Sequence, residues 1–289
     1  MIMKEMTLRE LQLFALEILK DVHQFCIQND IKYSLYAGTL LGAIRHQGFI
    51  PWDDDIDIVM PRDDYNRFCQ TYKSEKFFLT NRDNDSSFQL AYSRVCDIER
   101  TVYKAVEPCS KKPTGVWIDV FPADGCPPKD DIPSFYEKNR ILFYETAKVR
   151  WTMASFSSVL SEWVRCSKTY GQRYALKHII DLFRKKIHYT FCNNRQYWVN
   201  KLIELNMTYP FRNSSYWSVF TFFYKHTVYF SKDTFEHCEM MKFEDASFSV
   251  MCGWDAVLST LYGDYMKYPP VEQQTPQLRD WYTFYWKRS

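Results

Sequence analysis

The sequence predicts an α/β (α+β) protein, with a mixed sheet flanked by helices in the N-terminal half and a mostly helical C-terminal half packed on it. Three observations support this fold class. Apolar residues recur at helical spacing over residues 7–30. Acidic and aliphatic residues alternate over residues 55–60, which is the period of a strand. Residues 134–206 have helical patterns with basic faces, and we therefore divide the chain into domains 1–130 and 131–289.

The first elements follow from caps and periodicity. A helix over residues 7–30 begins with a capping box formed by Thr7 and Glu10. Residues 32–37 are tyrosine-rich and β-leaning, which indicates a short strand. A second helix over residues 38–46 begins at a glycine and ends at Gln47-Gly48.

The later elements are expected from the same signals. The strand Asp55–Met60 is followed by a helix that begins at Pro61. The remaining expected elements are strands at 77–79, 88–95 and 116–121, strands and loops at 216–252, a helix at 254–262, and an irregular tail after Pro269.

The composition is that of a globular protein with a sizeable core. Of the 289 residues, 46% are hydrophobic and 25% are charged. The 37 basic and 35 acidic residues give a net charge of +2, which excludes a nucleic-acid partner held by bulk charge. Glycine is scarce, at 8 residues, and Gly38, Gly42 and Gly48 cluster in one short segment. That segment lies just before the densest acidic cluster, where we expect the functional site.

The cysteines and the lack of a targeting signal indicate a cytoplasmic protein. The chain has nine cysteines and no Cys-x-x-Cys pair. We find no secretory signal and no apolar run of membrane-spanning length, so we expect free thiols in a reducing cytoplasm. A zinc site built from Cys96, Cys109 and Cys126 is the alternative, although their spacings match no standard zinc finger.

Four acidic side chains are candidates for a metal site. Asp55 and Asp57 are two residues apart on the expected strand, so they project from one face, and Asp53 shares their parity. Neighbouring carboxylates repel each other, and a hard divalent cation removes that penalty. Asp119, within an apolar strand, is the third acid expected to complete the site, with Asp124 as a weaker alternative.

The glycine turn before this strand is a candidate phosphate site. A helix that begins at Gly38 offers free N–H groups to an anion, and Thr39 adds a hydroxyl. Arg45 lies seven residues further, two turns along the same face, and is expected to reach the same anion. For His46 two interpretations stay open, a donor contact or a capping and packing role.

These motifs together resemble a known family. The segments GTLLGAIRH (38–46) and FIPWDDDIDI (49–58) closely resemble the LicD family of phosphotransferases, which is related to the fukutin and fukutin-related ribitol-phosphate transferases. The resemblance continues at WIDVFP (117–122) and LYGDYM (261–266). It implies a nucleotidyltransferase-like fold for residues 1–130, and a region 131–289 that completes the acceptor side.

The resemblance also implies a reaction and its residues. Gly38 and Thr39 would hold the donor phosphate, while Asp55, Asp57 and Asp119 would bind Mg²⁺ or Mn²⁺. The family moves phosphocholine or a polyol phosphate from a CDP-alcohol donor to a glycan or lipid-linked glycan hydroxyl. We expect in-line attack on the donor's β-phosphorus, releasing CMP. Arg45 would stabilise the phosphoryl oxygens, and Asp119 would bind metal or accept the hydroxyl proton.

Several alternatives stay open at this stage. One is a nucleotidyltransferase that adds NMP to a small molecule, and another is a catalytically dead glycan-binding relative. The basic aromatic stretch from Tyr170 to Tyr189 is either a solvated helix face or a peripheral contact with the inner face of a membrane. The motif at 262–266 either pins the C-terminal segment to the core or closes the donor or acceptor pocket.

Overall fold

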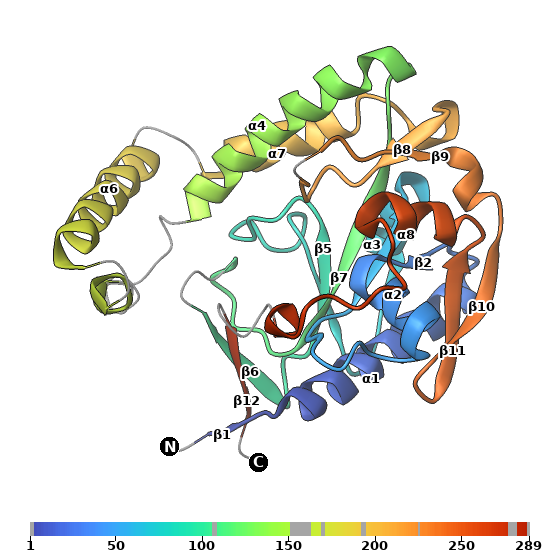
Figure 1. Ribbon diagram of the computed structural model, residues 1–289, viewed down its shortest axis with the longest axis horizontal. Helices are drawn as coiled ribbons and strands as arrows, with labels where there is room; N and C mark the ends of the chain where they lie inside the picture. Colours follow the sequence, from blue (N-terminus) through green and yellow to red (C-terminus); the bar gives the residue numbers. More distant parts are fainter. Residues whose placement is uncertain are drawn as a thin grey trace.

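The computed structural model describes residues 3–105, 109–150, 163–168, 171–191, 195–224, 226–276 and 282–287. It has a mixed sheet with helices around it, which confirms the predicted α/β class (Figure 1). The strands of the main path, in spatial order, are β2 (Ser34–Leu35), β3 (Asp57–Pro61), β7 (Trp117–Gly125), β5 (Ser93–Cys96) and β4 (Phe78–Thr80). β3 and β7 are parallel and the other neighbours in this order are antiparallel.

The sheet continues beyond β7 into the second half of the chain. β8 (Tyr216–Ser218) pairs with the end of β7, and β9 (Phe230–Ser231) pairs with β8. One hydrophobic core includes residues from Met6 to Phe284. The segments on either side of the predicted boundary near residue 130 therefore share a core.

Three helices of the N-terminal half have the expected positions. α1 (Leu8–Gln28) begins with the predicted capping box. α2 (Ala37–His46) ends at Gln47, whose φ of 57° lies in the left-handed region. α3 (Arg62–Thr71) follows β3 directly and contacts both β3 and β7.

The helices of the second half are α4 (Ile132–Arg150), α6 (Gln172–Phe191), α7 (Arg195–Asn206) and α8 (Trp254–Tyr262). α4 and α7 lie side by side, while α6 stands apart from the sheet (Figure 1). Residues 151–162, 169–170 and 192–194 of the predicted helical stretch lie outside the described residues. The shorter 3-10 helices are Lys129–Asp131, Phe211–Asn213, Lys232–Phe235 and Val271–Gln273.

In the second half, β10 (Cys238–Phe243) and β11 (Ala246–Met251) form a hairpin. A further strand, β12 (Tyr282–Trp286), was not predicted from the sequence. β12 pairs with β1 (Lys4–Glu5) on one side and with β6 (Thr101–Ala105) on the other. The prediction of an irregular tail was therefore wrong at β12. Its residues are all of strand-favouring types, a local signal that the prediction did not use, whereas its pairing partners are distant in sequence.

Two predicted strand boundaries also differ from the structure. β3 begins at Asp57, so Asp55 lies in the segment before the strand. Of the predicted strand 88–95, only the end is extended, as β5 (Ser93–Cys96). Phe88 and Leu90 instead form a small separate cluster with Cys109. Their burial explains the apolar pattern without a strand.

Candidate functional site

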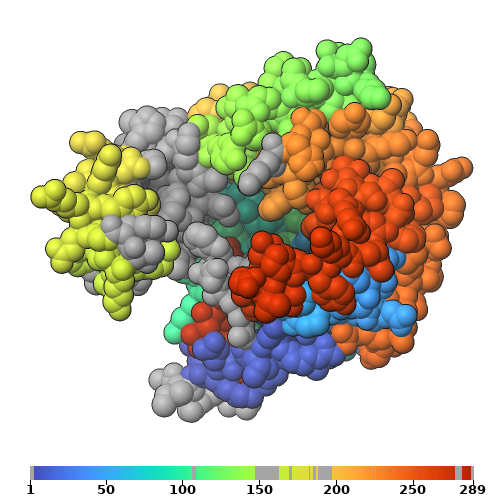
Figure 2. Space-filling model, in the orientation of Figure 1, coloured from blue at the N-terminus to red at the C-terminus, as the bar shows by residue number. Residues whose placement is uncertain are grey.

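The predicted acids and the glycine turn meet in a cavity of about 570 Å³. Its polar lining includes Asp53, Asp55, Asp57 and Asp119, and the backbone of Gly38 lies beside them. Figure 2 shows the surface hollowed between the green residues of α4 and the red C-terminal part, with blue-green residues at the bottom. The structure thus brings together all four acids that the sequence analysis proposed as metal ligands.

Sheet register places two of these acids opposite each other. Asp57 of β3 pairs with Asp119 of β7, and the N–H of Asp119 donates to the carbonyl of Ile56 at 2.9 Å. Ile56 and Ile58 are fully buried, while Asp55 and Asp57 are half-buried and line the cavity. The predicted alternation of acids and core isoleucines is therefore correct, although Asp55 precedes the strand itself.

Asp53 reaches the cavity through a loop that two other residues support. A Cβ atom on Gly38 would lie 2.7 Å from Asp53 Oδ2, so the absence of a side chain makes room for this carboxylate. The buried Gln12 of α1 donates its amide to the Asp53 carbonyl at 2.8 Å. The sequence analysis missed Gln12, whose only signal is a polar residue at an apolar position of α1.

The electrostatics of the cluster favour a cation. Burial, followed by the neighbouring Asp54 carboxylate, raises the pKa of Asp53 to about 6. The pKa values of Asp55 and Asp57 are raised well above the usual range, first by burial and then by Asp57 and Asp119 respectively. Carboxylate oxygens of Asp53, Asp54 and Asp55 lie within 4.8 Å of one another. An all-oxygen donor set of this kind fits Mg²⁺ or Mn²⁺.

Arg94 is a cavity residue that the sequence analysis missed. Its Nε donates to Asp119 Oδ1 at 2.7 Å, and both side chains are buried. Its guanidinium also stacks on the Trp117 ring, 4.1 Å from the ring centre, and donates to Cys109 Sγ at 3.1 Å. Burial raises the pKa of Asp119, and Arg94 opposes that rise. A signal was present in the sequence, since an arginine in a buried strand needs an acidic partner.

The α2 residues Thr39, Arg45 and His46, which were predicted to contact the donor phosphate, make other contacts in the structure. Thr39 is buried and its hydroxyl accepts from the N–H of Asp57 at 2.9 Å, so it anchors the start of β3. Arg45 does not line the cavity; its Nη1 donates to the carbonyls of Tyr265 at 2.8 Å and Lys267 at 3.3 Å. Seven residues of helix separate Arg45 from Gly38 by about 10 Å. His46 packs against Trp52 and Tyr268, which fits its predicted packing role.

Asp124 is not the third acid of the cavity, and the three cysteines do not form the alternative zinc site. Asp124 is buried in a two-pronged ion pair with Arg62, at 2.6 and 2.7 Å, and does not line the cavity. It lies five residues beyond Asp119, at the other end of β7. Among the residues that the structure describes, Cys96, Cys109 and Cys126 are free thiols and do not form a metal-ligating group.

The C-terminal motif takes part in both of the roles considered for it. Gly263 ends α8 with a positive φ of 68°, as expected, but its ψ of −122° lies outside the left-handed helical conformation that was predicted. Arg45 binds the turn that follows, through the carbonyl of Tyr265, and stacks on Tyr268. Tyr262 lines the cavity, whereas Asp264 is exposed. The motif is therefore pinned by Arg45 and closes one wall of the cavity with a tyrosine ring.

The apolar lining of the cavity is mostly aromatic. It comes from strands of the sheet, from α4, from the loop after β8 and from the end of α8. The aromatic lining residues are Tyr36, Tyr92, Phe121, Phe143, Phe222, Tyr224, Tyr262 and Tyr282. Such rings beside a carboxylate cluster form a surface that suits an organic cation. Most of these positions are far apart in sequence, so only the fold identifies them.

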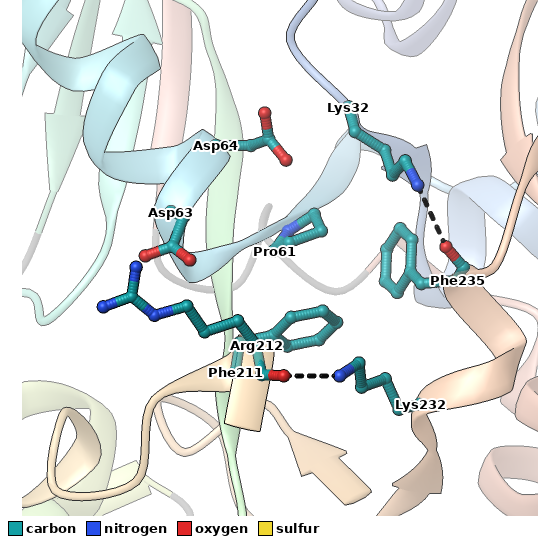
Figure 3. Close-up of a pocket in the computed structure, with 8 residues that line it drawn as sticks. All are labelled: Lys32, Pro61, Asp63, Asp64, Phe211, Arg212, Lys232 and Phe235. Carbon is teal, nitrogen blue, oxygen red and sulfur yellow. Dashed lines mark hydrogen bonds between the residues drawn. The ribbon is translucent and has the colours of Figure 1, made fainter. Parts of the chain in front are cut away.

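A second hollow of about 240 Å³ lies at the far end of β3, beside Pro61 (Figure 3). Its lysines are engaged by the backbone: Lys32 donates to the Phe235 carbonyl at 3.2 Å, and Lys232 to the Arg212 carbonyl at 2.6 Å. The first bond ties the 3-10 turn at 232–235 to the segment before β2, and the second joins that turn to the 3-10 turn at 211–213. The hollow is best described as a structural junction.

Comparisons with known proteins match the chain to one family. A family model described as LicD/FKTN/FKRP, nucleotidyltransferase domain, matches residues 30–158. The lipopolysaccharide cholinephosphotransferase LicD of Haemophilus influenzae is 34% identical over 280 residues, which cover 95% of this chain and 97% of that protein. An uncharacterized protein of Rickettsia typhi is 50% identical over 54 residues, or 19% of this chain and 18% of its own length. In the described part of the chain, none of the helices combines the length and the hydropathy that crossing a bilayer requires.

Proposed function

The chain belongs to the LicD family of phosphotransferases, and from that premise we propose that it transfers phosphocholine, or a related alcohol phosphate, from a CDP-linked donor to a glycan hydroxyl. The acceptor in this proposal is a cell-surface glycan of the lipopolysaccharide, capsule or teichoic acid type, free or lipid-linked. The near full-length relative is named as a lipopolysaccharide cholinephosphotransferase. We place the reaction in the cytoplasm, where the free thiols stay reduced.

One observation carries the proposal: four carboxylates and an aromatic wall face the same cavity. The carboxylates Asp53, Asp55, Asp57 and Asp119 supply the oxygen ligands for Mg²⁺ or Mn²⁺. When bound there, such an ion neutralises charge on the phosphoryl oxygens and the leaving group. The aromatic rings suit the quaternary ammonium of choline. A site with only one of these two features would fit the donor less well.

In the proposed reaction, each residue of the site has a separate role. The acceptor oxygen forms a bond to the donor's β-phosphorus, and the bond from that phosphorus to CMP breaks. The hydroxyl proton passes to a carboxylate, for which Asp119 is our candidate because it is held in place by Arg94 at 2.7 Å. The backbone at Gly38, at the start of α2, would bind the donor phosphate. Thr39 holds Asp57, and Gln12 holds the loop of Asp53.

The test is CMP release from a panel of donors. Purified protein is incubated with CDP-choline, CDP-ribitol and CDP-glycerol, with and without a lipopolysaccharide acceptor. The proposal expects CMP release that needs a divalent ion, that EDTA stops, and that is fastest with CDP-choline. Asp57→Asn is the inactive control.

The same assay separates the alternatives. A nucleotidyltransferase would release pyrophosphate when given CTP and a small acceptor, and would leave CDP-choline intact. A glycan-binding relative without activity would retain acceptor but release no CMP. Either result contradicts the proposal.

A further inference from the structure

α6 has an apolar stripe on an exposed side. Leu176, Ile180, Phe183 and Ile187 are 58%, 45%, 42% and 59% exposed. Their spacing of four, three and four residues places them within an arc of about 60° on one helix face. The stripe is about 17 Å long at the rise of an α-helix. Ala175, about 110° around the helix, is fully buried, so the stripe is not the face that packs on the protein.

A row of cations lies beside this stripe. Arg173, Lys177 and Arg184 are exposed, and their positions fall within an arc of about 40°. The centre of that arc is about 70° from the centre of the apolar stripe. An exposed apolar stripe with a basic border is the pattern of helices that lie in the interface of a bilayer. Scattered exposed apolar residues are normal on a protein surface, but four in register on one helix are not.

We propose that the stripe and its basic row, together the α6 face, dock on the surface of an anionic lipid bilayer. The apolar side chains would enter the headgroup boundary, and the cations would contact anionic headgroups. A second copy of the chain is the other candidate occupant. It would bring the same cations, and these would gain no attraction from one another, whereas an anionic membrane attracts all three.

The position of α6 gives this docking a use. α6 contacts α4, and α4 lines the cavity through Phe143 and Thr146. A bilayer on the α6 face therefore lies one helix away from the cavity. A lipid-linked acceptor held in that bilayer would be within reach of the donor. This use of the docking rests on the proposed function. The docking itself rests on the exposed residues of α6.

Vesicle co-sedimentation of the full chain tests the proposal. The probes are vesicles of phosphatidylcholine alone and of phosphatidylcholine mixed with phosphatidylglycerol. We expect binding to the anionic vesicles, little to the neutral ones, and release as salt is raised. Ile180→Glu combined with Phe183→Glu should weaken vesicle binding more than about tenfold, since each change removes an apolar side chain that the bilayer would bury. Replacing Arg173, Lys177 and Arg184 by Gln should weaken it about fivefold per charge.

Matched controls separate this effect from unfolding. Leu13 and Ile27 on α1 are 48% and 60% exposed, and their double change to Glu should leave vesicle binding intact. Circular dichroism checks that each variant is folded. The proposal is overturned if the wild-type protein stays in the supernatant, or if the Ile180→Glu, Phe183→Glu variant binds vesicles as well as the wild type does. It is also overturned if the wild type does not bind vesicles but forms a dimer that this variant dissociates. That result would assign the α6 face to a second copy of the chain.

Failure here is distinguishable from failure of the proposed function. Vesicle binding needs no donor, and CMP release from CDP-choline needs no vesicle. The α6 variants should therefore lose vesicle binding and keep the donor reaction in solution.

Discussion

Asp57 and Asp119 occupy directly paired positions on the parallel strands β3 and β7, and both line one cavity. Their register brings together acids that are 62 residues apart in the sequence. Each raises the cost of ionising the other, because burial and the Asp119 charge raise the pKa of Asp57. This arrangement is unfavourable for stability and useful for holding a cation. The predictions below follow from it and from its surroundings.

Asp57→Asn should abolish transfer and raise the melting temperature of the metal-free protein. The change removes a metal ligand and, at the same time, one of the charges that repel each other. We expect turnover to fall by more than about 100-fold, the upper end of what changes in a metal site's second shell cause. CMP release and thermal melting in EDTA measure the two effects. Asp130→Asn, at an exposed position, should change neither.

Divalent ions should stabilise the protein more as the pH rises. The pKa of Asp53 is about 6 in the folded state, against roughly 4 for an ordinary aspartate. Between these values the folded protein binds more protons than the unfolded one, so stability without metal falls as pH rises through this window. A divalent ion that binds the ionised carboxylates should reverse that fall. The melting temperature is measured with and without Mn²⁺ over about pH 4 to pH 8, a range that includes both pKa values. If it depends on pH in the same way in both series, the metal site is contradicted.

Arg45→Ala should lower stability, and Arg45→Lys should largely restore it. Arg45 donates to the carbonyls of Tyr265 and Lys267, and a lysine ammonium can donate to carbonyls as well. We expect Arg45→Ala to cost about 1 kcal/mol, discounted for its partial exposure. A phosphate clamp would behave differently: Arg45→Lys would then lose activity at an unchanged melting temperature. Thermal melting and CMP release on both variants distinguish the two roles.

Gly263→Ala should destabilise the protein by roughly 1 kcal/mol or more, because the φ of 68° strains any side chain there. The neighbouring position is the control. Asp264 is exposed and outside the cavity, so Asp264→Ala should change neither stability nor activity. Loss of activity in Asp264→Ala at an unchanged melting temperature would place that carboxylate at the site after all.

Tyr262→Ala should reduce activity with little change in stability. The ring lines the cavity but the residue is 41% exposed, so its removal leaves the core packed. If it contacts the donor's choline, KM for CDP-choline should rise more than KM for CDP-glycerol, which has no ammonium group. Equal effects on the two donors would remove Tyr262 from head-group recognition.

Arg94→Met should destabilise the protein by about 3–5 kcal/mol, because it leaves the buried Asp119 without its cation. Arg140→Met is the matched control. Arg140 pairs with Glu137 at the surface, where such a pair contributes little to stability. Denaturant unfolding measures both. Equal effects would show that the Arg94–Asp119 pair is screened like a surface pair.

Short-range patterns in the chain were enough to predict the local elements and the chemistry of the acids. The capping box at Thr7 and the alternation from Asp55 to Ile58 depend on interactions within a few residues, so their patterns are visible in the chain. The family followed from the same local motifs, since GTLLGAIRH lies within α2 and FIPWDDDIDI is one continuous segment that leads into β3. Asp119 was also found locally, as a single acid in an apolar strand.

What each side chain faces depends on contacts between segments that are far apart in the chain. Arg45 and Gly38 share a helix, yet one binds the C-terminal turn and the other opens to the cavity, because they lie at opposite ends of α2. Arg94 acquires its role from the register of β5 against β7, and the partners of β12 are β1 and β6, which the fold brings to either side of it. These are pairings between distant segments, and pairings of this kind leave no periodic signal in the sequence.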